Sequence, residues 1–156
     1  MIKDSKSAES LAKILSEALP YIQKFSGKIV VIKYGGSAMK ENKLRQNFAR
    51  DIALMKQIGI FPVLVHGGGP QIERNLKKNN IKSVFIDGLR KTDENSIKTI
   101  VKTLREVNGD IAELIKTWGA RTKTFNDVRE SILICKKIKT KMDLGFVGDI
   151  TKVDGN

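Results

Sequence analysis

The stretch IVVIKYGGSAM at residues 29–39 decides the fold of this chain, because a second stretch, FPVLVHGGGP at residues 61–70, repeats its pattern. In each stretch an apolar run with β propensity ends at consecutive glycines, and a helical pattern follows. Glycine lets the backbone come close to a ligand, and the N–H groups at a helix start attract anions. Lys33, just before the first glycines, would add a full positive charge. The two turns together predict one anion site.

Neither glycine turn has the spacing of a common nucleotide motif. The P-loop motif is a Gly, four intervening residues, and then Gly-Lys-Ser or Gly-Lys-Thr. The dinucleotide motif is Gly-x-Gly-x-x-Gly. Both patterns are absent from residues 35–39 and 67–70. A glycine pair after a strand is also a common plain turn, so this alternative stays open for each turn taken singly.

Length and composition indicate one globular domain. The chain has 156 residues, of which 40% are hydrophobic, which is enough for a single core. No apolar run approaches the roughly 20 residues that span a bilayer, and the N-terminus lacks the apolar core of a secretory signal. We therefore expect a cytoplasmic protein without membrane contact. A single cysteine and a single histidine exclude a disulfide and argue against a Cys/His metal site.

The net charge of +12 raises the question of nucleic-acid binding. Lysines are spread over nearly every predicted element, and aromatic residues make up only 6% of the chain, which is low for a base-stacking surface. The densest basic run, residues 136–141, is typical of an exposed hairpin edge. We therefore expect acidic small molecules rather than nucleic acid as ligands. A basic nucleic-acid binder stays as an alternative, which steep salt dependence would reveal.

The hydrophobic pattern predicts strands and helices in alternation. Helical spacing marks residues 7–25, with Pro20 as a kink, and three later segments that end at Gly59, begin at Pro70 and end at Gly119. Strands are predicted before each glycine turn and at residues 83–86. This order predicts a parallel sheet with right-handed crossovers and both glycine turns at its carboxyl edge. Thr92 is the expected N-cap of the last helix, and residues 121–153 indicate hairpins.

Four stretches, in this order, resemble the acetylglutamate kinases, a branch of the amino-acid kinase family. They are VIKYGGSAM at residues 31–39, VHGGGP at 65–70, GLRKTD at 88–93 and LGFVG at 144–148. The resemblance runs from residue 7 to residue 153. It implies an α/β fold, a three-layer α/β/α sandwich with a mainly parallel sheet. It also implies a kinked helix at residues 1–26 and the substrate-binding domain at residues 27–156, with the nucleotide-binding half absent.

The resemblance further implies ATP-dependent phosphorylation of the side-chain carboxylate of N-acetyl-L-glutamate in arginine biosynthesis. Mg²⁺ would arrive with ATP, and the protein itself would hold no metal. Lys33 would neutralise the transferring phosphoryl group, and Arg90 would hold the substrate α-carboxylate with its bidentate fork. A carboxylate with an ordinary pKa near 4.3 is ionised at neutral pH, so the reaction needs positioning and charge neutralisation rather than a general base. Gly35 and Gly36 would donate backbone N–H groups to the phosphate. Gly67 and Gly68 would donate backbone N–H groups to the substrate.

The N-terminal helix resembles the extra segment of arginine-inhibited family members, in which such helices interlace dimers into a hexameric ring. This implies a homo-oligomer of the hexamer-of-dimers type and L-arginine as an inhibitor, with Tyr21 at the inhibitor site. From the residues alone, the apolar stripe of this helix could cover the core of its own domain or pack on another subunit.

Two departures from the family pattern bear on activity. Family members continue into a second half with a further phosphate-binding lysine, so we expect the chain to be inactive alone. Residues 124–129 read TFNDVR, where the family has a Ser-Gly-Lys-Asp-like turn. A non-catalytic regulatory module that binds N-acetylglutamate or arginine is therefore the alternative function. We expect His66 to pack beside its turn, Asn108 to be solvated or capping, and Cys135 to fill core space.

Overall fold

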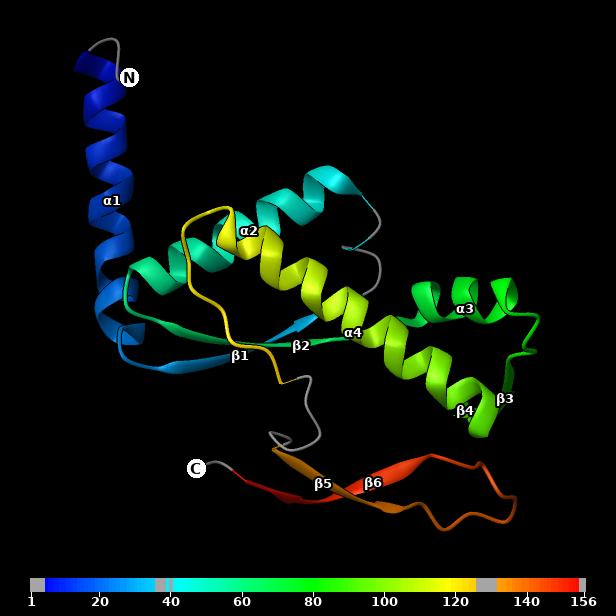
Figure 1. Cartoon of the computed structure of the whole chain (residues 1–156). Helices are drawn as coiled ribbons and strands as arrows, with labels where there is room; N and C mark the ends of the chain where they lie inside the picture. The colour runs from blue at the N-terminus through cyan, green and yellow to red at the C-terminus, as the bar shows by residue number, and fades with distance from the viewer. Residues whose placement is uncertain (1–4, 36–38, 40, 126–131, 155–156) are drawn as a thin grey trace.

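The fold of the chain is described by a computed structural model that covers residues 5–35, 39, 41–125 and 132–154 (Figure 1). It is an α/β fold, as expected. In chain order the elements are α1 (Ser5–Phe25), β1 (Ile29–Tyr34), α2 (Asn42–Gln57), β2 (Phe61–His66), α3 (Gly69–Lys78), β3 (Val84–Ile86), β4 (Leu89–Lys91), α4 (Glu94–Lys116), β5 (Leu133–Lys137) and β6 (Gly148–Val153).

The parallel sheet expected from the strand and helix order is formed by β1 and β2. Their register runs from Ile29 opposite Phe61 to Tyr34 opposite His66. The crossover between them is α2, which ends before Gly59, a residue in the left-handed region at φ +89°. Both strands begin and end within a residue or two of their predicted bounds, because apolar runs are bounded by glycines at both strand ends.

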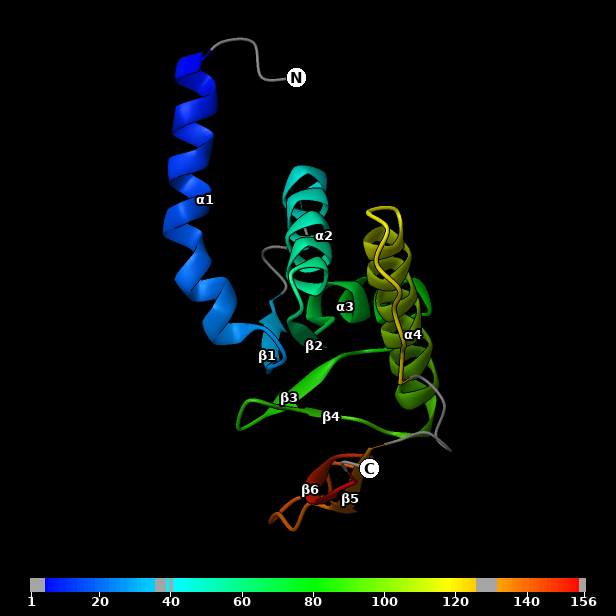
Figure 2. The ribbon, with the colours of Figure 1, turned by 90° about the vertical axis from the view of Figure 1, so that its left-hand side faces the viewer.

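Helices α2 and α4 lie side by side over one face of this sheet (Figures 1 and 2). Ile32 and Leu64 point to that face and pack against a cluster of buried side chains from the two helices. The members of this cluster are Ala49, Ile52 and Ile115. Period-two alternation places the intervening strand residues on the other face, where Ile29, Val31 and Val65 are exposed. The described residues therefore supply the sheet and one helical layer of the sandwich.

A second cluster holds the carboxyl end of β1. Tyr34 is 3% exposed and stacks on Phe48 of α2, with 3.8 Å between the ring centroids. Met39 and Val107 of α4 complete the cluster. Burial raises the pKa of the Tyr34 phenol. The strand end that carries the first glycine turn is thus fixed by packing to both helices.

Helix α1 does not cover the core of its own domain. It spans Ser5–Phe25 with Pro20 inside it, and none of its residues is buried. Figure 2 shows α1 standing to one side of the other elements and bending in its C-terminal part. Of the two alternatives for its apolar stripe, packing on its own core is therefore excluded within the described residues.

Helices α3 and α4 are joined by a buried polar contact. Asn75 Nδ2 donates to Thr103 Oγ1 over 2.9 Å, and Thr103 Oγ1 donates to the carbonyl of Thr99 over 2.7 Å. At the start of α4, the predicted N-cap Thr92 is wrong. The cap is Asp93, whose carboxylate accepts the Ser96 N–H over 2.8 Å, and this hydrogen bond lowers the pKa of Asp93.

Two hairpins complete the described fold. Strands β3 and β4 pair antiparallel, a hairpin of which the sequence had indicated only the first strand. Strands β5 and β6 also pair antiparallel, as expected of a hairpin within residues 121–153. Every residue of β5 is exposed, because no described element covers either face of the β5–β6 hairpin. Cys135 is exposed on β5, so the expectation that it fills core space is wrong.

Candidate anion site at the carboxyl edge of the sheet

The first residues of the two glycine stretches, Gly35 and Gly67, follow neighbouring strands at one edge of the sheet. Tyr34 and His66 are opposite each other as the last residues of β1 and β2, so Gly35 and Gly67 leave the sheet together. Neighbouring strands are about 4.8 Å apart, which sets the spacing of the two turns as they begin. Gly36 lies outside the described residues. The register of β1 and β2 thus brings together Gly35 and Gly67, which are 32 positions apart in the sequence.

Lys33 is the last residue but one of β1. It is exposed and lies on the face of the sheet that α2 and α4 leave open, because its neighbours Ile32 and Tyr34 point toward those helices. Within the described part of the chain, Lys33 forms no ion pair. Its charge is therefore available to a ligand, although contact of its ammonium with the glycine turns stays a prediction.

The second glycine turn opens directly into a helix. Gly68 is buried and is the N-cap of α3, with Pro70 in the first helical turn and no acidic residue there. The first N–H groups of a helix have no partner within it, and they carry the positive end of the helix dipole. A Cβ at Gly68 would lie 2.9 Å from Leu104 Cδ2 of α4, so glycine permits the close approach of this turn to α4. The turn therefore presents backbone donors suited to an anion.

Asn108 of α4 fixes the ring of His66 beside the second turn. The Gly67 carbonyl accepts from His66 Nδ1 over 2.9 Å, so the other ring nitrogen, Nε2, accepts from Asn108 Nδ2 over 3.1 Å. His66 packs beside its turn as expected. The expectation that Asn108 is solvated or capping is wrong, because its side chain is part-buried and bound to His66. No local sequence signal connects two residues 42 positions apart.

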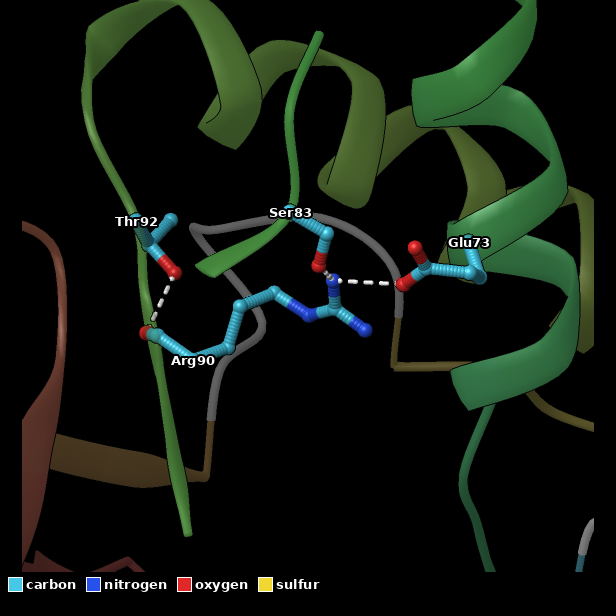
Figure 3. Close-up of polar contacts among 4 residues, drawn as sticks. All are labelled: Glu73, Ser83, Arg90 and Thr92. Atoms are coloured by element: carbon cyan, nitrogen blue, oxygen red, sulfur yellow. Dashed lines mark hydrogen bonds and ion pairs between the residues drawn. The ribbon is translucent and has the colours of Figure 1, made fainter. Parts of the chain in front are cut away.

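Arg90 of β4 reaches the first turns of α3 (Figure 3). Its Nη1 donates to Glu73 Oε2 over 3.0 Å and to the hydroxyl of Ser83, and its guanidinium lies over the Phe85 ring at 4.4 Å from the centroid. The hydrogen bond from Arg90 lowers the pKa of Glu73, with a smaller effect from Ser83. Because Glu73 is one helical turn from Gly69, these contacts place Arg90 near the second glycine turn. The sequence had indicated neither Glu73 nor Phe85.

The third and fourth sequence stretches also meet, through backbone hydrogen bonds. The Thr92 N–H donates to the Leu144 carbonyl over 2.8 Å, and the Phe146 N–H donates to the Thr92 carbonyl over 2.7 Å. Gly145 between them has φ +74°, and a Cβ there would lie 2.0 Å from the Thr92 oxygen. Only glycine fits this position. Residues 144–148 therefore hold the segment that follows Arg90.

Tyr21 does not join this edge. It is 67% exposed on α1, which leads into the amino end of β1, at the opposite end of the strand from Gly35.

A cavity of about 540 Å³ lies beside β2 and α4. It is lined by residues that include His66 and Asn108 but neither Lys33 nor Arg90. The described residues contain no group of three or more His, Cys, Asp or Glu side chains that could hold a metal ion, and no helix among them is long and apolar enough to cross a membrane.

Comparisons with known proteins show which family the sequence matches. Residues 28–142 match the amino acid kinase family. The chain is 47% identical over 144 residues to an acetylglutamate kinase of Clostridium beijerinckii, covering 92% of this chain and 50% of that protein. It is 44% identical over 166 residues to that of Stutzerimonas stutzeri, covering 99% and 55%. The chain thus spans about half the length of the curated relatives it matches.

Solved structures share the fold. A Streptococcus mutans protein, smu.665, has a TM-score of 0.69 at 26% identity, covering 80% of this chain and 50% of that one. N-acetylglutamate synthase of Neisseria gonorrhoeae, in complex with coenzyme A and L-arginine, has a TM-score of 0.64 at 24% identity, covering 89% and 34%.

Proposed function

Because this chain belongs to the amino acid kinase family, we propose that it carries the substrate-binding half of an acetylglutamate kinase. In the reaction, ATP phosphorylates the side-chain carboxylate of N-acetyl-L-glutamate, and Mg²⁺ enters as part of the ATP complex. The single observation that carries the proposal is the register of β1 and β2, which aligns Gly35 and Gly67, the first residues of the two glycine stretches, at one sheet edge. The pathway is arginine biosynthesis, in the cytoplasm.

Each site residue has one task in this proposal. Lys33 neutralises negative charge on the transferring phosphoryl group, and its freedom from ion pairs in the described chain supports that role. Gly35 and Gly36 donate backbone N–H groups to the phosphate, and Gly67 and Gly68 donate theirs to the substrate. A ligand carboxylate is ionised at neutral pH and attacks phosphorus without prior loss of a proton, so positioning and charge neutralisation suffice.

Arg90 holds the α-carboxylate of N-acetyl-L-glutamate. Its side chain is only 15% exposed, and Phe85 covers one face of its guanidinium, so the group is oriented before a ligand arrives. Orientation in advance reduces the entropy lost on binding. The planar fork of arginine matches a carboxylate in a way that the single ammonium of lysine does not.

Calorimetric titration with N-acetyl-L-glutamate tests the proposal. Arg90→Ala should weaken binding about ten-fold or more, because it removes charge-assisted hydrogen bonds. Arg50→Ala is the matched control, since Arg50 is exposed on α2 and pairs only with its neighbour Asp51 among the described residues. Equal affinities for the Arg90→Ala and Arg50→Ala proteins would remove the carboxylate role of Arg90.

The second candidate function is a regulatory module that binds N-acetylglutamate or arginine without catalysis. It predicts the same loss of binding for Arg90→Ala, but no binding of Mg²⁺-free tripolyphosphate, because a regulatory module needs no phosphate site at Lys33. Calorimetric titration with tripolyphosphate separates the two functions. We further propose a homo-oligomer in which α1 contacts another subunit and Tyr21 lies at a site for L-arginine, a proposal supported by the exposed apolar stripe of α1.

A further inference from the structure

The cation assigned to the substrate carboxylate already has a carboxylate partner in the same chain. Arg90 Nη1 and Glu73 Oε2 are 3.0 Å apart, and the side chains of Arg90 and Glu73 are 15% and 55% exposed. The Ser83 hydroxyl accepts from the same Nη1 (Figure 3). One arm of the guanidinium is thus occupied from within the protein.

The position of Glu73 places its charge at the proposed binding site. Side chains on a helix tilt toward its N-terminus, so a carboxylate one turn after Gly69 lies toward the second glycine turn. Phe85 covers one face of the guanidinium. Among the described residues, the Nε and Nη2 atoms of Arg90 make no hydrogen bond. These two donors are the edge of Arg90 that a second carboxylate can use.

We propose that Glu73 attenuates carboxylate binding at Arg90, by sharing the guanidinium with the incoming ligand. Arginine stays protonated in proteins, so two carboxylates compete for one positive charge. The ligand then gains less electrostatic energy than an unshared arginine would give. The identity of the ligand as N-acetyl-L-glutamate rests on the proposed function, whereas competition for Arg90 applies to any carboxylate.

The substitution Glu73→Gln separates the charge of Glu73 from its hydrogen bond. A glutamine carbonyl still accepts from Arg90 Nη1, while the competing negative charge is gone. The full 156-residue chain is titrated with N-acetyl-L-glutamate and, separately, with acetate, while the Nε–H signal of Arg90 is followed by NMR. We expect Glu73→Gln to bind both probes about two- to five-fold more tightly. The gain should shrink at high salt, because exposed charges are screened.

Glu113→Gln is the matched control. Glu113 forms an exposed ion pair with Lys116 at the end of α4, so the substitution makes the same charge change away from Arg90. The Glu113→Gln protein should bind N-acetyl-L-glutamate and acetate with the same affinities as the wild type. A second readout is the ¹³C titration of the Glu73 carboxyl group, whose pKa lies below the ordinary value because Arg90 donates to it. Saturating acetate should raise this pKa toward the ordinary value.

The outcomes distinguish this inference from the proposed function. Equal or weaker acetate binding by Glu73→Gln, no acetate binding to any of the proteins, or a Glu73 pKa that acetate leaves unchanged would overturn the inference, and Glu73 would then only position Arg90. If Glu73→Gln binds acetate more tightly but N-acetyl-L-glutamate binds no better than acetate, the inference stands and the proposed function fails. If N-acetyl-L-glutamate binds well and Glu73→Gln brings no gain, the proposed function stands alone.

Discussion

At the scale of single residues, the two cations of the site are in opposite situations. Lys33 is exposed at the end of β1 and has no ion pair in the described chain, whereas Arg90 is largely buried and paired with Glu73. An exposed ammonium on a flexible stem can follow a moving phosphoryl group. Phe85 and Glu73 hold the guanidinium of Arg90 in one position, so it suits a carboxylate that binds at a fixed place. These two situations are consistent with the different tasks that we propose for the two cations.

Lys33→Met should weaken binding of Mg²⁺-free tripolyphosphate about ten-fold, because it removes a charge-assisted contact from the phosphate site. Lys28→Met makes the same charge change just before the other end of β1 and should leave affinity within about two-fold, since surface charges far from a ligand are screened. Calorimetric titration at constant ionic strength measures both. Equal weakening by the two substitutions would mean that the net charge, and not a site at Lys33, attracts the anion.

At the scale of elements, α3 and α4 are held together by a polar contact in an apolar setting. Thr103 is 1% exposed and accepts the amide hydrogen of Asn75 across the helix pair. Because α3 carries both the second glycine turn and Glu73, this contact fixes the site relative to α4.

Thr103→Val should lower the free energy of unfolding by about 1–3 kcal/mol, because the part-buried Asn75 amide loses its acceptor while the side-chain volume is kept. Thr103→Ser keeps the hydroxyl and should lower the unfolding free energy by less, through the loss of one methyl group. Urea titration followed by circular dichroism measures both. A Thr103→Ser protein that is less stable than Thr103→Val would show that packing, rather than the hydrogen bond, dominates at this position.

The elements also show which features the sequence could predict. Strands β1 and β2 and helix α3 are marked by apolar runs that stop at glycines, so local pattern suffices. Strand β4 has three residues and no periodic signal of its own, and it forms because β3 pairs with it. Threonine and aspartate are both favoured as N-cap residues, so residue type alone does not choose between Thr92 and Asp93. Asp93 takes the role because the backbone of Thr92 is hydrogen-bonded to Leu144 and Phe146 and its hydroxyl donates to the Arg90 carbonyl.

The contacts that build the site lie beyond local pattern. Glu73 and Arg90 are 17 positions apart, and Asn108 and His66 are 42 apart. Neither pair follows a strand or helix period, so only the packing of α3 on α4 and of α4 on the sheet reveals them. The exposure of Cys135 has the same origin, since an apolar run in a hairpin is buried only where another layer covers it.

At the scale of the whole molecule, two apolar surfaces that the described residues leave open bear on assembly, besides the uncovered β5–β6 hairpin. One is the sheet face that bears Ile29 and Val31, which are 72% and 67% exposed, and the other is α1. Contiguous apolar surface of this kind is typical of interfaces. The α1 stripe repeats in steps of four and three residues, which is the spacing of paired helices. Its members are Leu11, Leu15, Ala18, Ile22 and Phe25.

We expect α1 to pair with α1 of a second copy, so the wild-type chain should sediment with a mass above the 17.4 kDa of one copy. Leu11→Glu with Leu15→Glu should return it to that mass, because two charges in the helix seam repel and oppose burial. Ser16→Glu with Gln23→Glu makes the same charge change on the other side of α1 and should keep the higher mass. Sedimentation equilibrium over a range of concentrations measures all three proteins. A wild-type chain of single-copy mass, or equal masses for the two double variants, would exclude α1 as the contact and leave the open sheet face as the surface to test next.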